Sequence, residues 1–267
     1  MLRLQRCLHK WHLQPDGALI ETHTSLLLPV RHVGGPAMLK ILKPTSDERA
    51  GADMLRYFGG LGAVRLIAAD DDAWVMERAA ADPSLLAMAL AGGDDPAAAI
   101  LADCVAQLHA PRGAPAPDGL IRLDDWFHSL FAREAELPLL ARCAAVARNM
   151  LATSREIVVL HGDLHHDNVL HSPRGWLAID PKGLIGERTY ELANLLCNPQ
   201  PHGTIVHRPE RMLRLAELYA ERLALNVQRV LGFALAHAGL SAAWSLEDGG
   251  DASYRLKCAE VLDPLVG

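Results

Sequence analysis

The spacing of apolar residues changes part-way along the chain, and this change predicts two regions of different architecture. Up to about residue 79, short apolar runs alternate with turn-forming residues, a pattern typical of strands. The strands expected from this pattern are residues 18–21, 25–30, 36–42, 63–69 and 73–77. Between the third and fourth, residues 47–58 carry apolar positions at helical spacing and end at a pair of glycines.

Beyond residue 80 the pattern is that of alanine- and leucine-rich helices. The segments with helical spacing are residues 83–90, 96–109, 124–153 and about 208–265, with breaks expected at Pro138, Gly239 and residues 248–250. We therefore expect an α+β protein of two lobes. Residues 1–79 would form a small antiparallel-sheet lobe with one main helix, and residues 80–267 a larger, mostly helical lobe. The ligand site would lie in the cleft between them.

Composition narrows the class of protein. The chain has 267 residues, half of them apolar, which suits a globular protein with a sizeable core. Its net charge of −6 argues against nucleic acid as a partner and would suit a cationic ligand. The five cysteines are scattered without a CxxC pair, and no segment reads as a signal peptide or membrane anchor. We expect a cytoplasmic protein with reduced thiols, no membrane association and no obligate protein partner.

The strongest chemical signal is the segment His161–Asn168, which reads HGDLHHDN. Asp163 and Asn168 have the spacing of a kinase catalytic loop, in which the aspartate accepts the substrate hydroxyl proton and the asparagine binds magnesium. A short apolar strand then delivers Asp180, a second candidate magnesium ligand. We expect His161 to brace this loop by hydrogen bonding. A zinc site built from the loop histidines lacks the usual ligand spacing.

A kinase also needs a lysine for the nucleotide phosphates, placed on the third strand of the sheet lobe. Both Lys40 and Lys43 lie there, and three residues along a strand put them on opposite faces. We prefer Lys40 as the lysine that enters the cleft, with Glu48 on the following helix as its ion-pair partner.

The remaining nucleotide contacts have weaker support. No glycine-rich loop is present, and the absence of GxxxxGK[ST] excludes a P-loop kinase. Thr24 and Ser25, in the turn between the first two strands, are candidates for contacting phosphate oxygens, or are ordinary turn residues. Glu77 and Ala79 follow the fifth strand, where a hinge would offer backbone groups to adenine.

These motifs together resemble the aminoglycoside phosphotransferases, most closely the streptomycin 6-phosphotransferase branch, also called aminoglycoside/hydroxyurea kinases. The similarity rests on the catalytic loop, on the segments 175–181 and 183–187, and on upstream and downstream stretches that include residues 39–53, 62–66 and 240–244. Asp180-Pro181-Lys182 replaces the Asp-Phe-Gly of protein kinases, and no Ala-Pro-Glu segment follows. Because of these two departures from protein kinases, we do not expect regulation by phosphorylation of an activation loop.

The resemblance implies a protein-kinase-like fold, ATP and Mg²⁺ as cofactors, and transfer of the γ-phosphoryl group to the 6-hydroxyl of streptomycin, a cationic small molecule. Glu187 is then a candidate for binding a guanidinium group of the substrate. Trp244, Glu247 and Asp248 are further substrate candidates, although a packing tryptophan and a solvated acidic turn would look the same. Lys182 is a candidate for stabilising the transferring phosphate.

Two other functions are compatible with the same residues. The first keeps the chemistry and changes the acceptor to another small amino sugar or cationic metabolite. The second is a nucleotide-binding pseudokinase that acts as a scaffold. The intact set of Lys40, Glu48, Asp163, Asn168 and Asp180 argues against the second.

Overall fold

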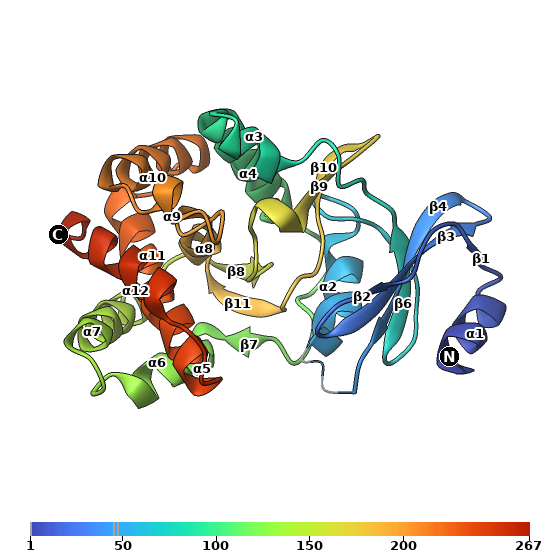
Figure 1. Ribbon diagram of the computed structural model, residues 1–267, viewed down its shortest axis with the longest axis horizontal. Coiled ribbons are helices and arrows are strands. Elements are labelled where there is room, and N and C mark those ends of the chain that lie inside the picture. Colours follow the sequence, from blue (N-terminus) through green and yellow to red (C-terminus); the bar gives the residue numbers. More distant parts are fainter. Residues whose placement is uncertain (1, 45, 47) are drawn as a thin grey trace.

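The computed structural model describes residues 2–44, 46 and 48–267, which form a sheet lobe and a larger helical lobe (Figure 1). The sheet lobe is built on six antiparallel strands in the order β1-β3-β4-β6-β5, with β2 paired to β3. Their bounds are β1 Gln14–Pro15, β2 Ile20–Glu21, β3 Ser25–His32, β4 Gly35–Leu42, β5 Leu66–Ala69 and β6 Ala73–Glu77. The predicted two-lobe, protein-kinase-like α+β fold is confirmed.

One face of this sheet is covered by a helix that was not predicted, α1 (Leu2–Lys10). The helix lies along the sheet (Figure 1), and its apolar residues Leu4, Cys7 and Leu8 belong to one hydrophobic cluster with the sheet residues Val30 and Leu39. The helix is short and its other face is basic, so its stability comes from this packing rather than from its own sequence.

The other face of the sheet packs against α2 (Gly51–Phe58). Successive side chains of β6 point to opposite faces of the sheet. Val75 therefore packs in the cluster on the α1 face, and Trp74 and Met76 pack in the cluster on the α2 face. The predicted helix over 47–58 begins later, because Glu48 lies in the short 3₁₀ turn η1 (Glu48–Ala50). Its expected first residue, Asp47, lies outside the described residues.

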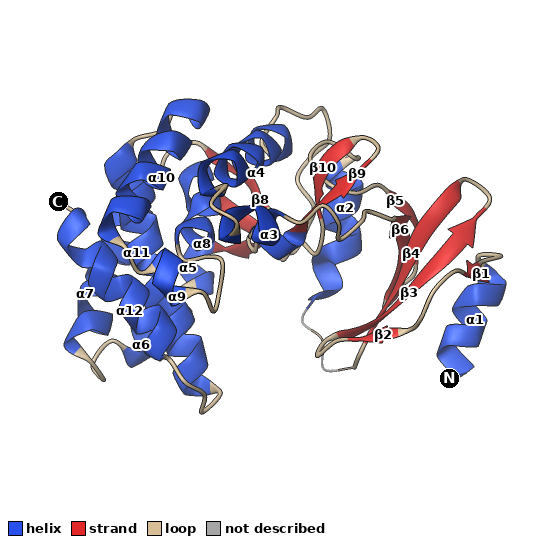
Figure 2. Ribbon diagram, turned by 45° about the horizontal axis from the view of Figure 1, so that its top comes forward, coloured by secondary structure: helices blue, strands red, loops and turns tan. Residues whose placement is uncertain are grey.

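The helical lobe surrounds a central buried helix, α11 (Val227–Glu247) (Figure 2). The other helices are α3 Leu85–Leu90, α4 Asp94–Leu108, α5 Leu123–Trp126, α6 His128–Arg133, α7 Pro138–Ala152, α8 Ala193–Leu196, α9 Gly203–Val206, α10 Pro209–Leu223 and α12 Ser253–Leu262. Short 3₁₀ turns are η3 Arg188–Leu192 and η4 Asp263–Leu265. Pro138 stands at the start of α7, so the break expected there is present.

The break expected at Gly239 is wrong, because α11 runs through this position without interruption. A Cβ atom at Gly239 would lie 2.4 Å from the Cβ of Cys143 in α7. The glycine therefore lets two helices approach closely and does not end one. The break expected at residues 248–250 is present, since α11 ends at Glu247.

Two small sheets carry the catalytic segments between the lobes. β8 (Ile157–Leu160) and β11 (Leu184–Glu187) pair antiparallel, with β7 (Ile121–Arg122) parallel to β11. The hairpin of β9 (Val169–Ser172) and β10 (Gly175–Ala178) reaches back toward the sheet lobe. There the Ala178 N–H donates to the Gly62 carbonyl at 2.8 Å. These strands position the site against both lobes.

No helix of the described residues combines the length and the apolar character that crossing a bilayer requires. The five cysteines are buried free thiols. The lobe boundary expected after residue 79 remains a prediction, although β6 ends at Glu77 and α3 begins at Leu85.

Candidate active site

The segment His161–Asn168 leaves the end of β8 as a loop that is held from inside the helical lobe. The buried Glu191 accepts hydrogen bonds from the backbone N–H groups of His161 at 2.7 Å and Gly162 at 2.9 Å. The His161 ring contacts the Ile179 carbonyl through Nε2 at 2.8 Å and accepts from the Asp163 N–H through Nδ1 at 3.3 Å. The predicted bracing by His161 is therefore present, and Glu191 adds a second support.

The Glu191 carboxyl is itself stabilised in its charged form. Burial raises its pKa, but the hydrogen bond with His109, the electrostatic influence of His109 and His161 and the N–H of Gly162 outweigh burial, so its pKa lies below the ordinary value. His109 contacts Glu191 through Nε2 at 3.1 Å. A charged acceptor makes the bonds to the loop stronger than a neutral one would.

The loop brings the three candidate acidic and amide residues together. The Asn168 side chain donates to the Asp163 carbonyl at 2.8 Å, which leaves its amide oxygen for another partner. The Ile179 N–H donates to the Asn168 carbonyl at 2.9 Å, so Asp180 follows directly beside Asn168. Asp180 has φ +58°, a left-handed conformation that is strained for a residue other than glycine.

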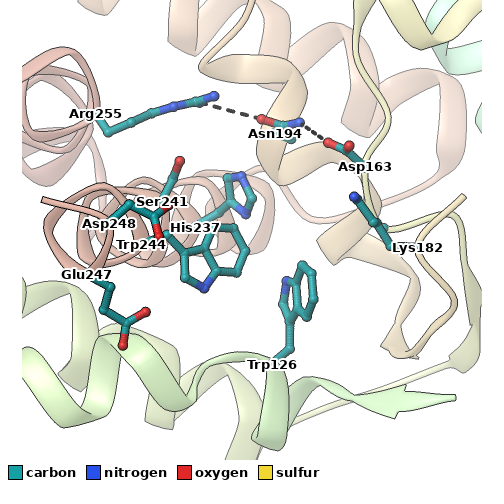
Figure 3. Close-up of a pocket in the computed structure, with 11 residues that line it drawn as sticks. Trp126, Asp163, Lys182, Asn194, His237, Ser241, Trp244, Glu247, Asp248 and Arg255 are labelled. Atoms are coloured by element: carbon teal, nitrogen blue, oxygen red, sulfur yellow. Dashed lines mark hydrogen bonds between the residues drawn. The ribbon is translucent and has the colours of Figure 1, made fainter. Parts of the chain in front are cut away.

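Asp163 is partly buried at the edge of this loop. Burial raises its pKa, and the electrostatic influence of the nearby His165, Lys182 and His161 opposes part of that rise. Asn194 donates from Nδ2 to Asp163 Oδ1 at 3.3 Å (Figure 3). A carboxyl group with a raised pKa is a better proton acceptor in its charged form, as a general base requires.

Lys40 connects the sheet lobe to the second acidic residue. Its Nζ lies 2.7 Å from Glu48 Oε2 and 2.8 Å from Asp180 Oδ1, and the side chain is 2% exposed. Lys43 instead pairs with Glu21 at 2.8 Å, on the opposite face of the strand. The predicted Lys40–Glu48 ion pair is present, and Lys40 is the lysine that faces the cleft.

Thr24 and Ser25, the two candidate phosphate contacts at the start of β3, differ in what their hydroxyl groups contact. The Thr24 hydroxyl donates to Glu48 Oε1 at 3.0 Å, so it lies beside the Lys40 ion pair. Ser25 is buried, and its hydroxyl is 3.0 Å from that of Thr22 within the same turn. Its hydroxyl is thus engaged within the turn, which favours the ordinary turn role, and a phosphate contact from this side chain remains a prediction.

Glu77 and Ala79, the two candidate contacts for adenine at the end of β6, differ in whether their polar groups are already bonded. The Glu77 carboxylate forms an ion pair with Arg174, and its backbone N–H donates to the Arg65 carbonyl at 2.8 Å. Both groups are therefore occupied. The N–H of Ala79 has no backbone partner among the hydrogen bonds of the described residues, so Ala79 remains the candidate for contact with adenine.

A pocket of about 410 Å³ opens beside Asp163 in the helical lobe. The predicted substrate residues Trp244, Glu247 and Asp248, at the end of α11, line it (Figure 3). The indole of Trp244 packs edge-to-face on that of Trp126, with ring centroids 4.9 Å apart. Carboxylates on one side and an aromatic pair in the wall are groups that favour an organic cation.

The same pocket also carries positive charge, on the side nearer Asp163. Lys182 and Arg255 line it there (Figure 3). Lys182 Nζ is 3.7 Å from Glu48 Oε1, so this lysine lies between the two lobes and does not point away from the cleft. The pocket is therefore electrically divided, with acidic groups on the α11 end and basic groups beside the catalytic loop.

Glu187 does not belong to this pocket, and its prediction as a substrate ligand is wrong. Its side chain is 3% exposed and forms an ion pair with Arg229, with a bond of 2.7 Å to the Arg229 Nε. It also accepts from the Arg155 N–H at 3.0 Å. The carboxylate does bind a guanidinium group, but one that belongs to the same chain.

Several pocket and support residues were not predicted from the sequence. They are Trp126, Glu191, Asn194, His237 and Arg255. Asn194 follows Glu191 by three residues, in the segment Tyr190–Asn194 that comes shortly after β11. These polar residues so close to the catalytic motifs could have indicated both positions. The others lie far apart in the sequence and meet only in the folded lobe.

The protein groups near the loop suit a magnesium ion shared with a nucleotide better than a metal held by protein alone. Among the described residues, no three His, Cys, Asp or Glu side chains converge as a protein-only metal site would require. Magnesium in kinases is held differently, by one or two protein oxygens together with phosphate oxygens and water. Asp180, with one carboxylate oxygen beside Lys40, and the amide oxygen of Asn168 fit that smaller donor set.

Comparison with known proteins identifies the group to which these features belong. Residues 10–249 match the family described as aminoglycoside/hydroxyurea antibiotic resistance kinases. The chain belongs to this family. As a member of this kinase family it is a phosphotransferase, in agreement with the resemblance drawn from the motifs.

The names of individual relatives differ in the position of streptomycin that is phosphorylated. A streptomycin 3''-kinase of Klebsiella pneumoniae is 45% identical over 246 residues, covering 91% of this chain and 92% of that protein. A streptomycin 6-kinase of Streptomyces griseus is 33% identical over 258 residues, covering 91% and 82%. The predicted family is therefore confirmed, whereas the predicted 6-specificity is not.

A solved structure gives the same fold. A thermostable mutant of an aminoglycoside phosphotransferase, crystallised with ADP and hygromycin B, aligns with a TM-score of 0.68 at 15% identity over 98% of each chain. At this identity the likeness concerns the fold alone.

Proposed function

We propose that this kinase transfers the γ-phosphoryl group of ATP to a hydroxyl group of streptomycin. The observation that carries the proposal is the pocket beside Asp163, which joins a catalytic carboxylate to an acidic and aromatic wall suited to a cationic sugar. Curated relatives that cover most of the chain are named streptomycin kinases, which supports this acceptor.

The nucleotide would be held from the sheet lobe. Lys40, kept in place by Glu48, offers its ammonium group to the phosphates, and the Ala79 N–H is the candidate contact for adenine. Asp180 and Asn168 would hold Mg²⁺, which neutralises phosphate charge when bound. In the structure Lys40 already contacts Asp180, so the lysine and the metal ligand are held side by side.

The acceptor would be activated from the helical lobe. Asp163 accepts the hydroxyl proton, and Asn194 fixes one of its carboxylate oxygens so that the other can face the substrate. Lys182 is placed to stabilise charge on the phosphoryl group during transfer. Because such transfer has a loose transition state, alignment and charge neutralisation contribute more than basicity.

For the position of transfer, we favour the 3''-hydroxyl over the 6-hydroxyl that the sequence motifs suggested. The relative named a 3''-kinase is more similar to this chain than the relatives named 6-kinases, at 45% against 33% and 31% identity. Two-dimensional NMR of the phosphorylated product assigns the position directly. A phosphorus coupling to the proton at carbon 6 would reject this choice while leaving the kinase assignment intact.

The proposed activity is tested by ADP release with ATP and Mg²⁺, with and without streptomycin. Wild-type enzyme should show streptomycin-dependent turnover, and Asp163→Asn should reduce it by about 10²–10⁴-fold with ATP binding retained. Asp167→Asn is the matched control, because Asp167 lies in the same loop with its side chain 58% exposed. Absence of turnover with streptomycin, or full turnover in Asp163→Asn, would contradict the proposal.

A further inference from the structure

A row of three hydrogen-bonding side chains runs through the wall of the pocket beside Asp163. Trp126 in α5 donates from Nε1 to the Tyr190 hydroxyl at 2.8 Å. The same hydroxyl lies 2.9 Å from Nδ1 of His237 in α11. Trp126 and His237 line the pocket, while Tyr190 is buried behind them. Three elements far apart in the sequence thus meet at one hydroxyl group.

The direction of these hydrogen bonds follows from what each group can do. An indole N–H can only donate, so the Tyr190 oxygen must accept from Trp126. Burial raises the pKa of Tyr190, so the phenol keeps its proton. Within the described chain, the Tyr190 hydroxyl has no acceptor other than His237 Nδ1. The O–H group therefore donates to Nδ1, since the alternative leaves a buried hydroxyl proton without a partner.

This direction sets the chemical state of His237. Burial, assisted by the positive charge of Arg255, lowers the pKa of His237 to about 3, so the ring is neutral at neutral pH. A neutral imidazole with an accepting Nδ1 carries its proton on Nε2. Among the described residues no protein group bonds to Nε2, and this nitrogen is not one of the buried polar atoms that lack a partner. The ring thus presents an N–H group to the pocket (Figure 3).

We propose that the His237 Nε2–H group is a fixed, uncharged donor that recognises a hydroxyl or other uncharged oxygen of the acceptor molecule. The inference rests on the proposed function, because it takes this pocket as the acceptor site. An N–H donor has no attraction for the N–H groups of a guanidinium or ammonium. The cationic groups of the acceptor therefore lie toward Glu247 and Asp248, and an uncharged part of the sugar faces His237. His237 is in this way a specificity-determining residue.

The first test compares two substitutions at the same position. His237→Phe keeps a ring of similar size without a donor, and should lower kcat/KM for streptomycin about tenfold with the KM for ATP unchanged. His237→Gln can accept from Tyr190 and donate to the pocket, so it should recover most of the loss. Equal losses in both variants would point to packing alone and overturn the inference, as would full activity in His237→Phe. Thermal unfolding of both variants shows that the comparison uses folded enzyme.

The second test reads the proton position directly. In enzyme labelled with ¹⁵N-histidine, the signals absent from His237→Gln belong to His237, and we expect the Nε2–H tautomer. Streptomycin should shift that N–H signal on binding. An Nδ1–H tautomer would overturn the inference whatever the acceptor. If wild-type enzyme does not phosphorylate streptomycin, the proposed function fails, but the tautomer still decides whether the pocket wall carries an uncharged donor.

Discussion

Two buried ion pairs in this kinase look alike in composition but differ in how completely the protein occupies them. Lys40 lies between Glu48 and Asp180 in the cleft, where Asp180 keeps one carboxylate oxygen free of Lys40 and has a side chain 28% exposed. Glu187 and Arg229 lie inside the helical lobe, where Arg155, Thr153 and Met150 add further bonds. The first cluster has capacity left for a ligand, whereas the second has its hydrogen-bonding groups occupied by the chain.

In these two clusters, unfilled hydrogen-bonding capacity distinguishes the ion pair at the ligand cleft from the ion pair that supports the fold, whereas burial and charge do not. Both clusters contain a carboxylate that the sequence marked as functional, and the most buried member of each, Lys40 or Glu187, is only 2% or 3% exposed. A buried charge is stable only when its bonding capacity is filled. When the chain itself fills that capacity, the pair supports the fold, and when capacity remains at a cleft, a ligand can complete it.

The largest effect on stability is expected for the occupied pair. Glu187→Gln should lower the free energy of unfolding by about 3–5 kcal/mol, because it leaves the Arg229 charge buried without its partner. Urea unfolding measures this change, and kcat of the folded fraction should stay near wild type. The double variant Glu187→Gln/Arg229→Met should regain stability. A large loss of kcat in a stable Glu187→Gln protein would return Glu187 to the catalytic site.

The cleft pair should respond in the opposite way. Lys40→Met should reduce kcat by about 10²–10³-fold, because the phosphates lose a charged donor positioned in a buried site. The melting temperature should change less than for Glu187→Gln. Lys43→Met, just past the end of the same strand and paired with Glu21, is the control and should keep activity. Near wild-type kcat in Lys40→Met would remove Lys40 from the nucleotide site.

The acceptor pocket should show a smaller effect confined to one substrate. Trp244→Ala removes the aromatic wall shared with Trp126 and should raise the KM for streptomycin about tenfold, with the KM for ATP unchanged. Steady-state kinetics with each substrate varied in turn makes this distinction. Trp176→Ala, in the β9–β10 hairpin, is a control of the same size. A change in the ATP KM alone would move Trp244 out of the acceptor site.

The smallest effect is a shift in pH dependence. Asp163 acts as a base only when deprotonated, and the positive charge of Lys182 opposes the rise of its pKa caused by burial. In Lys182→Met that pKa should rise further, so the acidic limb of the kcat/KM profile moves to higher pH. Lys257→Met, a surface lysine paired with Glu260, should leave the profile in place. A limb that stays or moves to lower pH would show that Lys182 does not act on the base.

The catalytic half of the site was predictable because its chemistry depends on short-range spacing. Asp163 and Asn168 lie in one loop, and Asp180 ends the strand pair that directly follows it. The alternation of side chains along the strand also predicted opposite faces for Lys40 and Lys43 and favoured Lys40, but it left open which lysine enters the cleft, and the contacts of Lys40 with Glu48 and Asp180 decide that. For the loop residues, local geometry leaves few ways to arrange the side chains, so the sequence alone is sufficient.

The acceptor half was decided by packing between distant elements. Trp126, Tyr190 and His237 come from α5, η3 and α11, and their direction of hydrogen bonding exists only once they meet. The same holds for α1, whose apolar residues need the sheet beneath them, and for Gly239, whose role depends on Cys143 in another helix.

Glu187 shows the limit most clearly. Its place at the end of β11 suggested a residue near the cleft, and its charge suggested a guanidinium partner. The sequence by itself determined the kinase loop, the order of the lobes and the identity of the charged residues. Only the tertiary structure decided which of those charges the chain neutralises internally, because that depends on Arg229, 42 positions along the chain, reaching the same buried space.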